Sequence, residues 1–185
     1  KAQRHPDQVR ALAYTNRRVQ SLNQMIRTAI YGADVRQFVV GERLIANHPC
    51  LNDETMLLPT SMECEVKFAA EATSGMWRIW HLDVITEEDE HRSLRVLHPD
   101  SAAEVKARLA ADDKDCRWME FWELKQFFHD VTYAYSLTIH KSQGSTFQDV
   151  FVDVPNMHIN RNVIERNQLA YVAMTRAAKR LFLYQ

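Results

Sequence analysis

The sequence is poor in glycine, with four glycines in 185 residues, and none of them lies in a GxxxxGK[ST] pattern. That pattern is the Walker A loop, whose backbone amides cradle nucleotide phosphates, so the chain lacks this cradle. No apolar run approaches the roughly 20 residues of a membrane-spanning helix, which excludes such a helix. The first ten residues lack the apolar core of a secretion signal. Because the chain opens on Lys1 without a methionine, we expect it to be a piece of a longer protein.

Cysteine is also scarce, and the histidines are scattered. Cys50, Cys64 and Cys116 are odd in number and far apart. This argues against a disulfide framework or a CxxC zinc site and favours buried or incidental thiols in a reducing compartment. No two of the eight histidines stand at a metal-ligand spacing such as HxxxH, and the acidic run 87–90 is interpreted as a solvated turn. No metal site is predicted.

Charge is distributed unevenly although the net charge is only −1. Residues 1–45 carry +5, residues 46–130 carry −9 and residues 131–185 carry +3. Basic ends that flank an acidic middle indicate that the ends meet phosphate and the middle does not. A solvated acidic face on an inserted segment explains the middle equally well and is compatible with that interpretation.

Both ends of the chain are typical of an α/β domain. Residues 9–14 predict a strand, after which Thr15 and Asn16 offer helix N-cap oxygens. Apolar residues then recur at helical spacing until Gly32, at Val19, Leu22, Met25, Ile26, Ala29 and Ile30. Towards the C-terminus we expect strands at 134–140, 149–154 and 180–184, with a helix near 163–175.

The middle of the chain follows a different pattern. Short β-type runs between 38 and 97 include the hairpin WRIWHLDVI–EEDEH–SLRVL and predict a small barrel. A capping box at Ser101–Glu104 predicts a helix to about Ala111, and a second helix is expected from Arg117 to His129. One face of the second helix is aromatic and is interpreted as packing rather than base stacking: Trp118, Phe121, Trp122, Lys125 and Phe128.

Two polar clusters interrupt the apolar runs of the α/β part. The turn 140–145 combines a lysine charge, two serine hydroxyls and a glutamine with Gly144, which lets backbone amides approach an anion. Such groups are the usual partners of nucleic-acid phosphates, although an ordinary polar loop has a similar composition. Arg176 follows a helix, where its planar fork suits two phosphoryl oxygens. From residue type alone, however, a cap on the final carbonyls of its own helix is favoured.

Three segments carry a resemblance to a known family. LTIHKSQGSTF (137–147) resembles motif V of superfamily 1 helicases, and YVAMTRA (171–177) resembles motif VI. LAYTNRRVQSLNQMIR (12–27) resembles the motif IV region of the RecD- and Dda-like branch, and the run 119–144 resembles the approach to motif V in Dda-type helicases. The order of the motifs, with a β-rich insertion between IV and V, is that of the second RecA-like domain with its 2B insertion.

The resemblance implies an α/β fold of the RecA-like, P-loop-NTPase type that lacks the P-loop itself. It also implies an inserted SH3-like β-barrel with a helical extension. The expected boundaries are 1–37 for the first part of domain 2A, 38–131 for domain 2B with its extension at about 99–130, and 132–185 for the second part of 2A.

The resemblance further implies roles for single residues. Arg176 matches the motif VI arginine finger and is the expected catalytic residue. The expected nucleotide contacts are Arg17, Arg18, Gln143, Gly144 and Arg176. The expected DNA contacts are Thr15, Asn16, Thr138, His140, Lys141 and Ser142. Many relatives hold the ribose with a carboxylate two residues after the motif V glycine, but this chain has Thr146 there.

These roles predict the C-terminal motor half of a superfamily 1B, ATP-dependent 5′→3′ DNA helicase in the cytoplasm of a bacterial or phage-infected cell. ATP and Mg²⁺ would be bound mainly by an absent 1A domain, so the chain alone is expected not to hydrolyse ATP. Its expected partners are single-stranded DNA and the 1A and 1B domains of the same protein. One alternative is a helicase-like nucleic-acid-binding module without motor activity, in a relaxase or exonuclease subunit. A plain protein-interaction domain is a third possibility, but it leaves both polar clusters unexplained.

Overall fold

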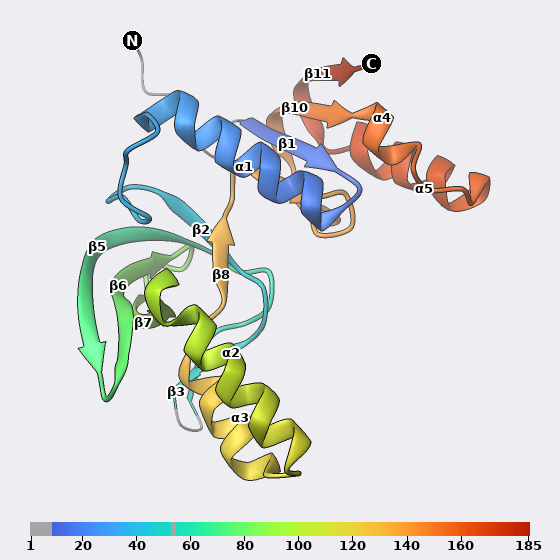
Figure 1. Cartoon of the computed structure of the whole chain (residues 1–185). Helices are drawn as coiled ribbons and strands as arrows, with labels where there is room; N and C mark the ends of the chain where they lie inside the picture. The colour runs from blue at the N-terminus through green and yellow to red at the C-terminus, as the bar shows by residue number, and fades with distance from the viewer. Residues whose placement is uncertain (1–8, 53–54) are drawn as a thin grey trace. The chain divides into compact units, whose positions relative to one another are not determined.

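The computed structural model describes residues 9–52 and 55–185, which fall into two compact units (Figure 1). One unit combines the residues up to Val35 with Tyr133–Gln185, and the other is Arg36–Thr132. Within the described ranges, no helix combines the length and the apolar character that crossing a membrane requires.

The first unit is built on a four-stranded parallel sheet. Its order is β11 (Ala177–Tyr184), β10 (Phe147–Asp153), β1 (Val9–Ala13) and β9 (Ser136–Thr138). β9 is much shorter than the predicted strand 134–140, since it begins only at Ser136 and ends at Thr138, where the polar turn follows. Leu12 and Ala13 of β1 and Val150 and Val152 of β10 are buried, whereas Phe151 of β10 is 45% exposed.

In the described part of this unit there are three helices: α1 (Asn16–Tyr31), the single turn α4 (Val154–Met157) and α5 (Val163–Met174). In the strand order of the sheet, β9 lies on one side of β1, whereas β11 lies on the opposite side, next to β10. Because such crossovers are right-handed, α1 and α5 cover opposite faces. The predicted strand–turn–helix at the N-terminal end is confirmed, since Thr15 caps α1 and Gly32 ends it with a φ of 92°.

The buried face of α1 differs from the prediction. Met25 and Ile30 are exposed, whereas Asn23 and Arg27 are buried. Asn23 lies against β9, the edge strand, where its side-chain oxygen accepts from the Ser136 N–H at 2.7 Å and its amide nitrogen donates to the Ser136 carbonyl at 3.3 Å. The side chain thus satisfies the outward backbone groups of an edge strand, which no apolar residue can do.

The second unit contains a five-stranded sheet and a two-stranded ribbon. The sheet order is β7 (His91–Leu97), β6 (Trp77–Thr86), β5 (Glu63–Ser74), β2 (Arg43–Ala46) and β8 (Val131–Tyr133), and the ribbon pairs β3 (Cys50–Asn52) with β4 (Thr55–Leu58). The predicted hairpin is confirmed as β6 and β7, which pair antiparallel from Ile79 opposite Leu97 to Ile85 opposite His91.

His129 ties the two ends of this sheet together. Its backbone N–H donates to the Arg95 carbonyl of β7 at 2.7 Å, and its Nδ1 accepts from the Arg95 N–H at 2.9 Å, two residues before β8 begins. Its Nε2 lies 2.8 Å from the Leu51 carbonyl, so the ring is neutral with the proton on Nε2. Burial lowers the pKa of this histidine, which favours the same neutral form. The sheet therefore curls towards closure, and its assignment as SH3-like stays a prediction.

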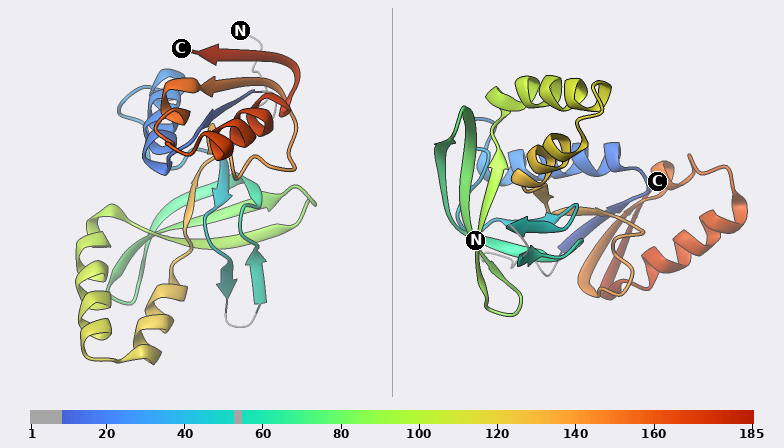
Figure 2. Two further views of the ribbon diagram at one scale, coloured as in Figure 1. Left: turned by 90° about the vertical axis from the view of Figure 1, so that its right-hand side faces the viewer. Right: turned by 90° about the horizontal axis from the view of Figure 1, so that it is seen from below.

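The helical extension consists of α2 (Pro99–Lys114) and α3 (Trp118–Phe127), which lie side by side (Figure 2). The predicted cap of α2 was wrong: His98 caps the helix, and the Ser101 hydroxyl instead accepts from the Arg78 N–H at 2.9 Å. The packing of the aromatic face is only partial, although the Phe121 ring lies edge-on to those of Trp118 and Trp122. No residue of α3 is buried, and Trp118 and Trp122 are about half exposed, at 52% and 50%.

The three thiols divide by burial. Cys50 and Cys64 are buried and Cys116 is exposed. Burial raises the pKa of Cys50 to about 11 and that of Cys64 to about 12, so both stay protonated near neutral pH. The buried pair therefore behaves as part of the apolar core rather than as reactive thiolates.

The bonds between Asn23 and Ser136 lead to a stability prediction. Asn23→Ala leaves a buried N–H and a buried carbonyl of β9 without their partner, so we expect the free energy of unfolding to fall by about 1–3 kcal/mol. The adjacent exposed residue Gln24 provides the control, because Gln24→Ala should change it by less than about 0.5 kcal/mol. Urea unfolding measures both variants, and equal stability of the two would contradict the role of Asn23.

Candidate functional site

Two turns lie at the carboxyl edge of the parallel sheet. Thr15 and Asn16 follow β1, and His140 and Lys141 follow β9 after one further residue. β1 and β9 run parallel, with Ala13 opposite Thr138, so both turns begin at the same edge. The sheet therefore brings together two of the segments that the sequence singled out, although about 125 residues separate them.

The first turn presents the N-terminus of α1. The Thr15 hydroxyl oxygen accepts from the Arg18 N–H at 3.3 Å, and the Thr15 carbonyl accepts from the Val19 N–H at 3.0 Å. Asn16 and Arg17 are exposed, and their N–H groups precede the first intrahelical bond. The first turn of α1 has no acidic residue. Exposed amides and the positive end of the helix dipole favour an anion here.

Asn156 holds this turn through hydrogen bonds that were not predicted from the sequence. Its side-chain oxygen accepts from the Tyr14 N–H at 2.8 Å and from the Thr15 N–H at 2.9 Å. Its side-chain nitrogen donates to the Thr15 hydroxyl oxygen at 3.1 Å. Asn156 is almost fully buried, at 9% exposed. The segment Asp153–Asn156 carries a Pro-Asn pair just after a strand, a turn signal that points to this segment but not to its partners.

Arg18, an expected nucleotide contact, is paired with a carboxylate of its own domain. Its Nε lies 2.5 Å from Oδ2 of Asp153, a carboxylate that is nearly buried. The other oxygen of Asp153 accepts from the Asn156 N–H at 3.0 Å. Arg18 thus locks α1 to the end of β10. Arg17 stays exposed and has no such partner among the described residues.

The second turn is held by two of the residues that were expected to contact DNA. The Ser142 hydroxyl is fully buried and donates to the Ile139 carbonyl at 2.7 Å. The Thr138 hydroxyl oxygen, also buried, accepts from the Lys141 N–H at 3.2 Å. Direct DNA contact by these two side chains is not supported, because their polar atoms face the turn. The two side chains shape the turn that carries its more exposed neighbours.

His140 and Lys141 lie on the outer side of that turn. The His140 side chain is 57% exposed, with Nε2 3.9 Å from a Glu165 oxygen. Its ring centroid lies 6.1 Å from that of Tyr14, which belongs to the first turn. Lys141 is partly exposed and Gln143 is exposed. The two turns therefore meet, and a histidine and a lysine accompany the N-terminus of α1.

The connection after β9 then crosses the sheet. β10 also runs parallel to β1, with Asp149 opposite Val9, so β10 begins at the amino edge. β10 begins about six residues before the level of Ala13. The chain must therefore return roughly 20 Å, measured along the strand, before β10 can start. Gly144 turns the chain with a φ of 91°, a left-handed value that glycine adopts without strain. One short segment thus joins the two edges of the sheet.

Arg176 lies at the amino edge, between α5 and β11. Its Nε donates to the Val172 carbonyl at 3.0 Å, one terminal nitrogen donates to the Ser145 carbonyl at 3.0 Å, and the other donates to the Thr175 hydroxyl at 2.9 Å. Three of the five guanidinium N–H groups are used, which leaves one on each terminal nitrogen. Arg176 both caps its helix and grips the segment that arrives from the carboxyl edge.

Comparison with known proteins agrees with this arrangement of motifs. Residues 133–184 match the UvrD-like helicase C-terminal domain family. The chain is 28% identical over 206 aligned residues to the ATP-dependent DNA helicase Dda of Enterobacteria phage T4, covering 94% of this chain and 46% of that protein. The chain therefore spans about half the length of this relative.

Solved structures of Pif1 helicases show the same fold. The Bacteroides enzyme in complex with ADP-AlF3 and ssDNA matches all of this chain and 42% of its own, with 12% identity and a TM-score of 0.54. The Candida albicans enzyme matches 95% of this chain and 44% of its own, with 15% identity and a TM-score of 0.52.

The chain is therefore similar to the C-terminal domain of superfamily 1B helicases. The resemblance found in motifs IV, V and VI is thereby confirmed, as is the mixed α/β fold of domain 2A.

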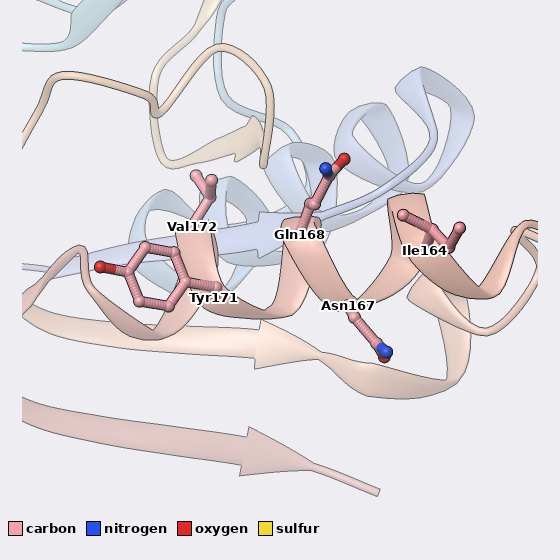
Figure 3. Close-up of a pocket in the computed structure, with 5 residues that line it drawn as sticks. All are labelled: Ile164, Asn167, Gln168, Tyr171 and Val172. Carbon is pink, nitrogen blue, oxygen red and sulfur yellow. The ribbon is translucent and has the colours of Figure 1, made fainter.

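In this helicase domain, α5 bears an open hollow of about 550 Å³ on its outer surface. The lining is mostly apolar and includes no charged side chain: Ile164, Asn167, Gln168, Tyr171 and Val172. Figure 3 shows Gln168 and Val172 projecting from the same side of the helix. A hollow without a cationic side chain does not suit phosphate, and none of the site residues expected from the sequence lines it.

Proposed function

We propose that this chain is the C-terminal motor half of an ATP-dependent DNA helicase that moves 5′→3′ along single-stranded DNA. The observation that carries the proposal is the segment 139–146, which joins the carboxyl edge of the sheet to the amino edge. At one end it lies beside the N-terminus of α1, and at the other it is held by Arg176. A single rigid connection between two anion-binding places suits a motor that couples nucleotide turnover to a grip on DNA.

The groups that would bind DNA lie at the carboxyl edge of the sheet. The N-terminus of α1, with Asn16 and Arg17, would bind one backbone phosphate, and Lys141 with His140 would bind the next. All of these groups suit phosphate and none is arranged to read a base edge, so binding independent of sequence is expected. The exposed ring of His140 offers a surface on which a base can stack.

The nucleotide contact belongs to the amino edge. Arg176 would direct its two remaining N–H groups at the phosphoryl group being transferred and stabilise the charge that develops there. Gln143 and the backbone at Gly144 lie on the same connection and would contact the nucleotide beside it. The carboxylates of this sheet are already paired, Asp149 with Arg180 and Asp153 with Arg18. Mg²⁺ would therefore be bound outside this chain, by a 1A domain that carries the Walker motifs.

The inserted unit Arg36–Thr132 would be the 2B domain, an SH3-like barrel with α2 and α3 as its extension. Its curled sheet and the closing bonds of His129 support this assignment. The 1A and 1B domains of the same protein would complete the motor, so the chain alone would hydrolyse no ATP. A cytoplasmic role in DNA replication, repair or recombination would follow from this activity.

One observation favours a second candidate, a nucleic-acid-binding module without motor activity. Arg176 makes the contacts of an ordinary helix cap, to Val172 and Thr175 of its own helix end. An arginine with that role alone has no part in ATP turnover. The two candidates therefore differ in what the loss of Arg176 does.

Replacing Arg176 tests the proposed arginine finger. In the full-length protein we expect Arg176→Ala to lower the DNA-stimulated rate of ATP hydrolysis by about 10³–10⁵-fold and to leave ATP affinity nearly unchanged. Arg176→Lys keeps the charge but loses the planar fork, so it should restore only a small part of the rate. Arg161 is an exposed arginine before α5, and the control variant Arg161→Ala should hydrolyse ATP at the wild-type rate. A normal rate in Arg176→Ala with a lower melting temperature would identify Arg176 as a helix cap.

Replacing Lys141 tests the proposed phosphate contact through the salt dependence of DNA binding. Each phosphate neutralised on single-stranded DNA contributes about 0.7 to the slope of log K against log salt concentration. Lys141→Ala should therefore weaken binding and reduce that slope by about 0.7. Lys179→Ala removes the same charge from β11, where the ammonium lies 3.0 Å from Gln148, and should change neither. An unchanged slope in Lys141→Ala would exclude a phosphate contact by this lysine.

A further inference from the structure

Two aromatic side chains lie uncovered on the outer half of the parallel sheet. Phe151 of β10 and Phe182 of β11 are paired in register, and their rings stack with centroids 4.4 Å apart and an interplanar angle of 9°. Phe151 is 45% exposed and Phe182 is 38% exposed, and Tyr184, on the same face of β11, is exposed as well. Parallel sheets are normally covered on both faces, so this aromatic pair marks a surface on which another segment packs.

α1 lies on the same face of the sheet but leaves this half of it open. Alternate residues of a strand point to opposite faces, so Asp153 shares its face with Phe151. Arg18 of α1 bonds Asp153, which places α1 on the Phe151 face. α1 packs over β1 and β9, however, and α5 covers the opposite face. Among the described residues, therefore, no helix covers β10 and β11 on the Phe151 face.

The side of α1 that borders the open half is apolar. Leu22 and Met25 follow Arg18 at spacings of four and seven residues, which puts them on the same side of the helix as Arg18. Met25 is 59% exposed, and Leu22 is partly exposed. Met25 belongs to the apolar pattern from which a buried face of α1 was predicted. A segment that packs on Phe151 and against this side of α1 accounts for both exposed surfaces.

The outer edge of β11 is open as well. In the part of the chain that the structure describes, β11 pairs only with β10 and therefore ends the sheet (Figure 2). Leu181 and Leu183, which point to the α5 face of β11, are also exposed. An apolar strand with a free edge and uncovered side chains on both faces is a template for pairing with a further strand.

The handedness of crossovers indicates where the covering segment comes from. The connections β1–β9, β9–β10 and β10–β11 all lie within the described chain, so a further connection enters β1 or leaves β11. A right-handed connection from β11 to a strand outside it moves in the same direction as β10 to β11, so its helix lies on the α5 face. A right-handed connection from a strand outside β11 to β1 moves in the same direction as β1 to β9, so its helix lies on the α1 face. Only the second connection places a helix on Phe151 and Phe182.

We propose that the polypeptide preceding residue 1 in the full-length protein supplies a strand and an amphipathic helix to this sheet. The strand pairs with the outer edge of β11, and the helix packs on Phe151, Phe182 and Met25. This chain spans about half the length of its relative Dda, so a protein of that length has ample sequence for such a unit. The inference does not rest on the proposed motor activity, because a binding module built on this sheet needs the same cover.

A photo-crosslinker on the sheet face tests the inference in the full-length protein. Phe182 is replaced by p-benzoyl-L-phenylalanine, an aromatic residue that bonds to nearby C–H groups on irradiation. Mass spectrometry after proteolysis should identify an intramolecular crosslink to the sequence that precedes residue 1. The same replacement at Phe68, a residue of β5 that is 48% exposed in the other unit, is the matched control and should not give that crosslink.

The other crosslinking products contradict the inference. A covalent dimer on a denaturing gel would show that a second copy covers the face. A crosslink to a segment that does not precede residue 1 would overturn the inference too, as would a yield no higher than that of the Phe68 control.

The wild-type protein provides a second measurement if the crosslinker variant does not fold. Hydroxyl radicals oxidise exposed phenylalanine rings, and Phe68 and Phe151 are nearly equally exposed here, at 48% and 45%. In the full-length protein Phe151 and Phe182 should be oxidised several-fold more slowly than Phe68, because the preceding segment covers them. Equal rates at the three rings would refute the inference. Neither readout involves ATP or DNA, so failure of the proposed function leaves both unchanged.

Discussion

The parallel pairing of β1 with both β9 and β10 is the constraint on which the rest of this domain depends. Because the three strands point the same way, the turns after β1 and β9 must meet at one edge, and the chain must return about 20 Å before β10 can begin. The returning segment is motif V. Its two ends therefore belong to different edges of the sheet. This separates His140 and Lys141, which are expected at DNA, from Arg176, which is expected at the nucleotide. Arg17 and Arg18 were also expected at the nucleotide, but they lie at the carboxyl edge.

Buried polar side chains make that arrangement rigid. Asn156 and Asp153 hold the turn after β1, Ser142 and Thr138 hold the turn after β9, and Arg176 holds the far end of the connection. Each of these bonds satisfies a backbone group of the two turns, of the connection between them or, for Asp153, of Asn156 itself. The partly exposed Lys141 and the exposed Gln143 follow these anchored residues, and a preorganised turn loses less conformational freedom when it binds a ligand.

Local signals made part of this structure predictable from the sequence. Thr15 and Gly32 mark the two ends of α1, and they were predictable because helix caps act within a few residues. The β6–β7 hairpin was predictable from the alternation of apolar and polar residues in its strands. The buried face of α1 was not predictable, since Asn23 is buried only against Ser136, 113 residues away. The role of Asn156 was not predictable for the same reason, because its partner Tyr14 lies 142 residues away in the sequence. For Ser142, residue type alone does not distinguish a hydroxyl that binds DNA from one that closes a turn.

The central claim is that the two edges of one sheet bind two different ligands. Hydrogen–deuterium exchange of the full-length protein tests this most directly, with single-stranded DNA and a non-hydrolysable ATP analogue added separately. We expect DNA to slow exchange in residues 16–18 and 140–142 at the carboxyl edge, and the ATP analogue to slow exchange in 143–146 and 172–176 at the amino edge. Protection of the amino-edge segments by DNA, with residues 16–18 unchanged, would contradict the division of the site.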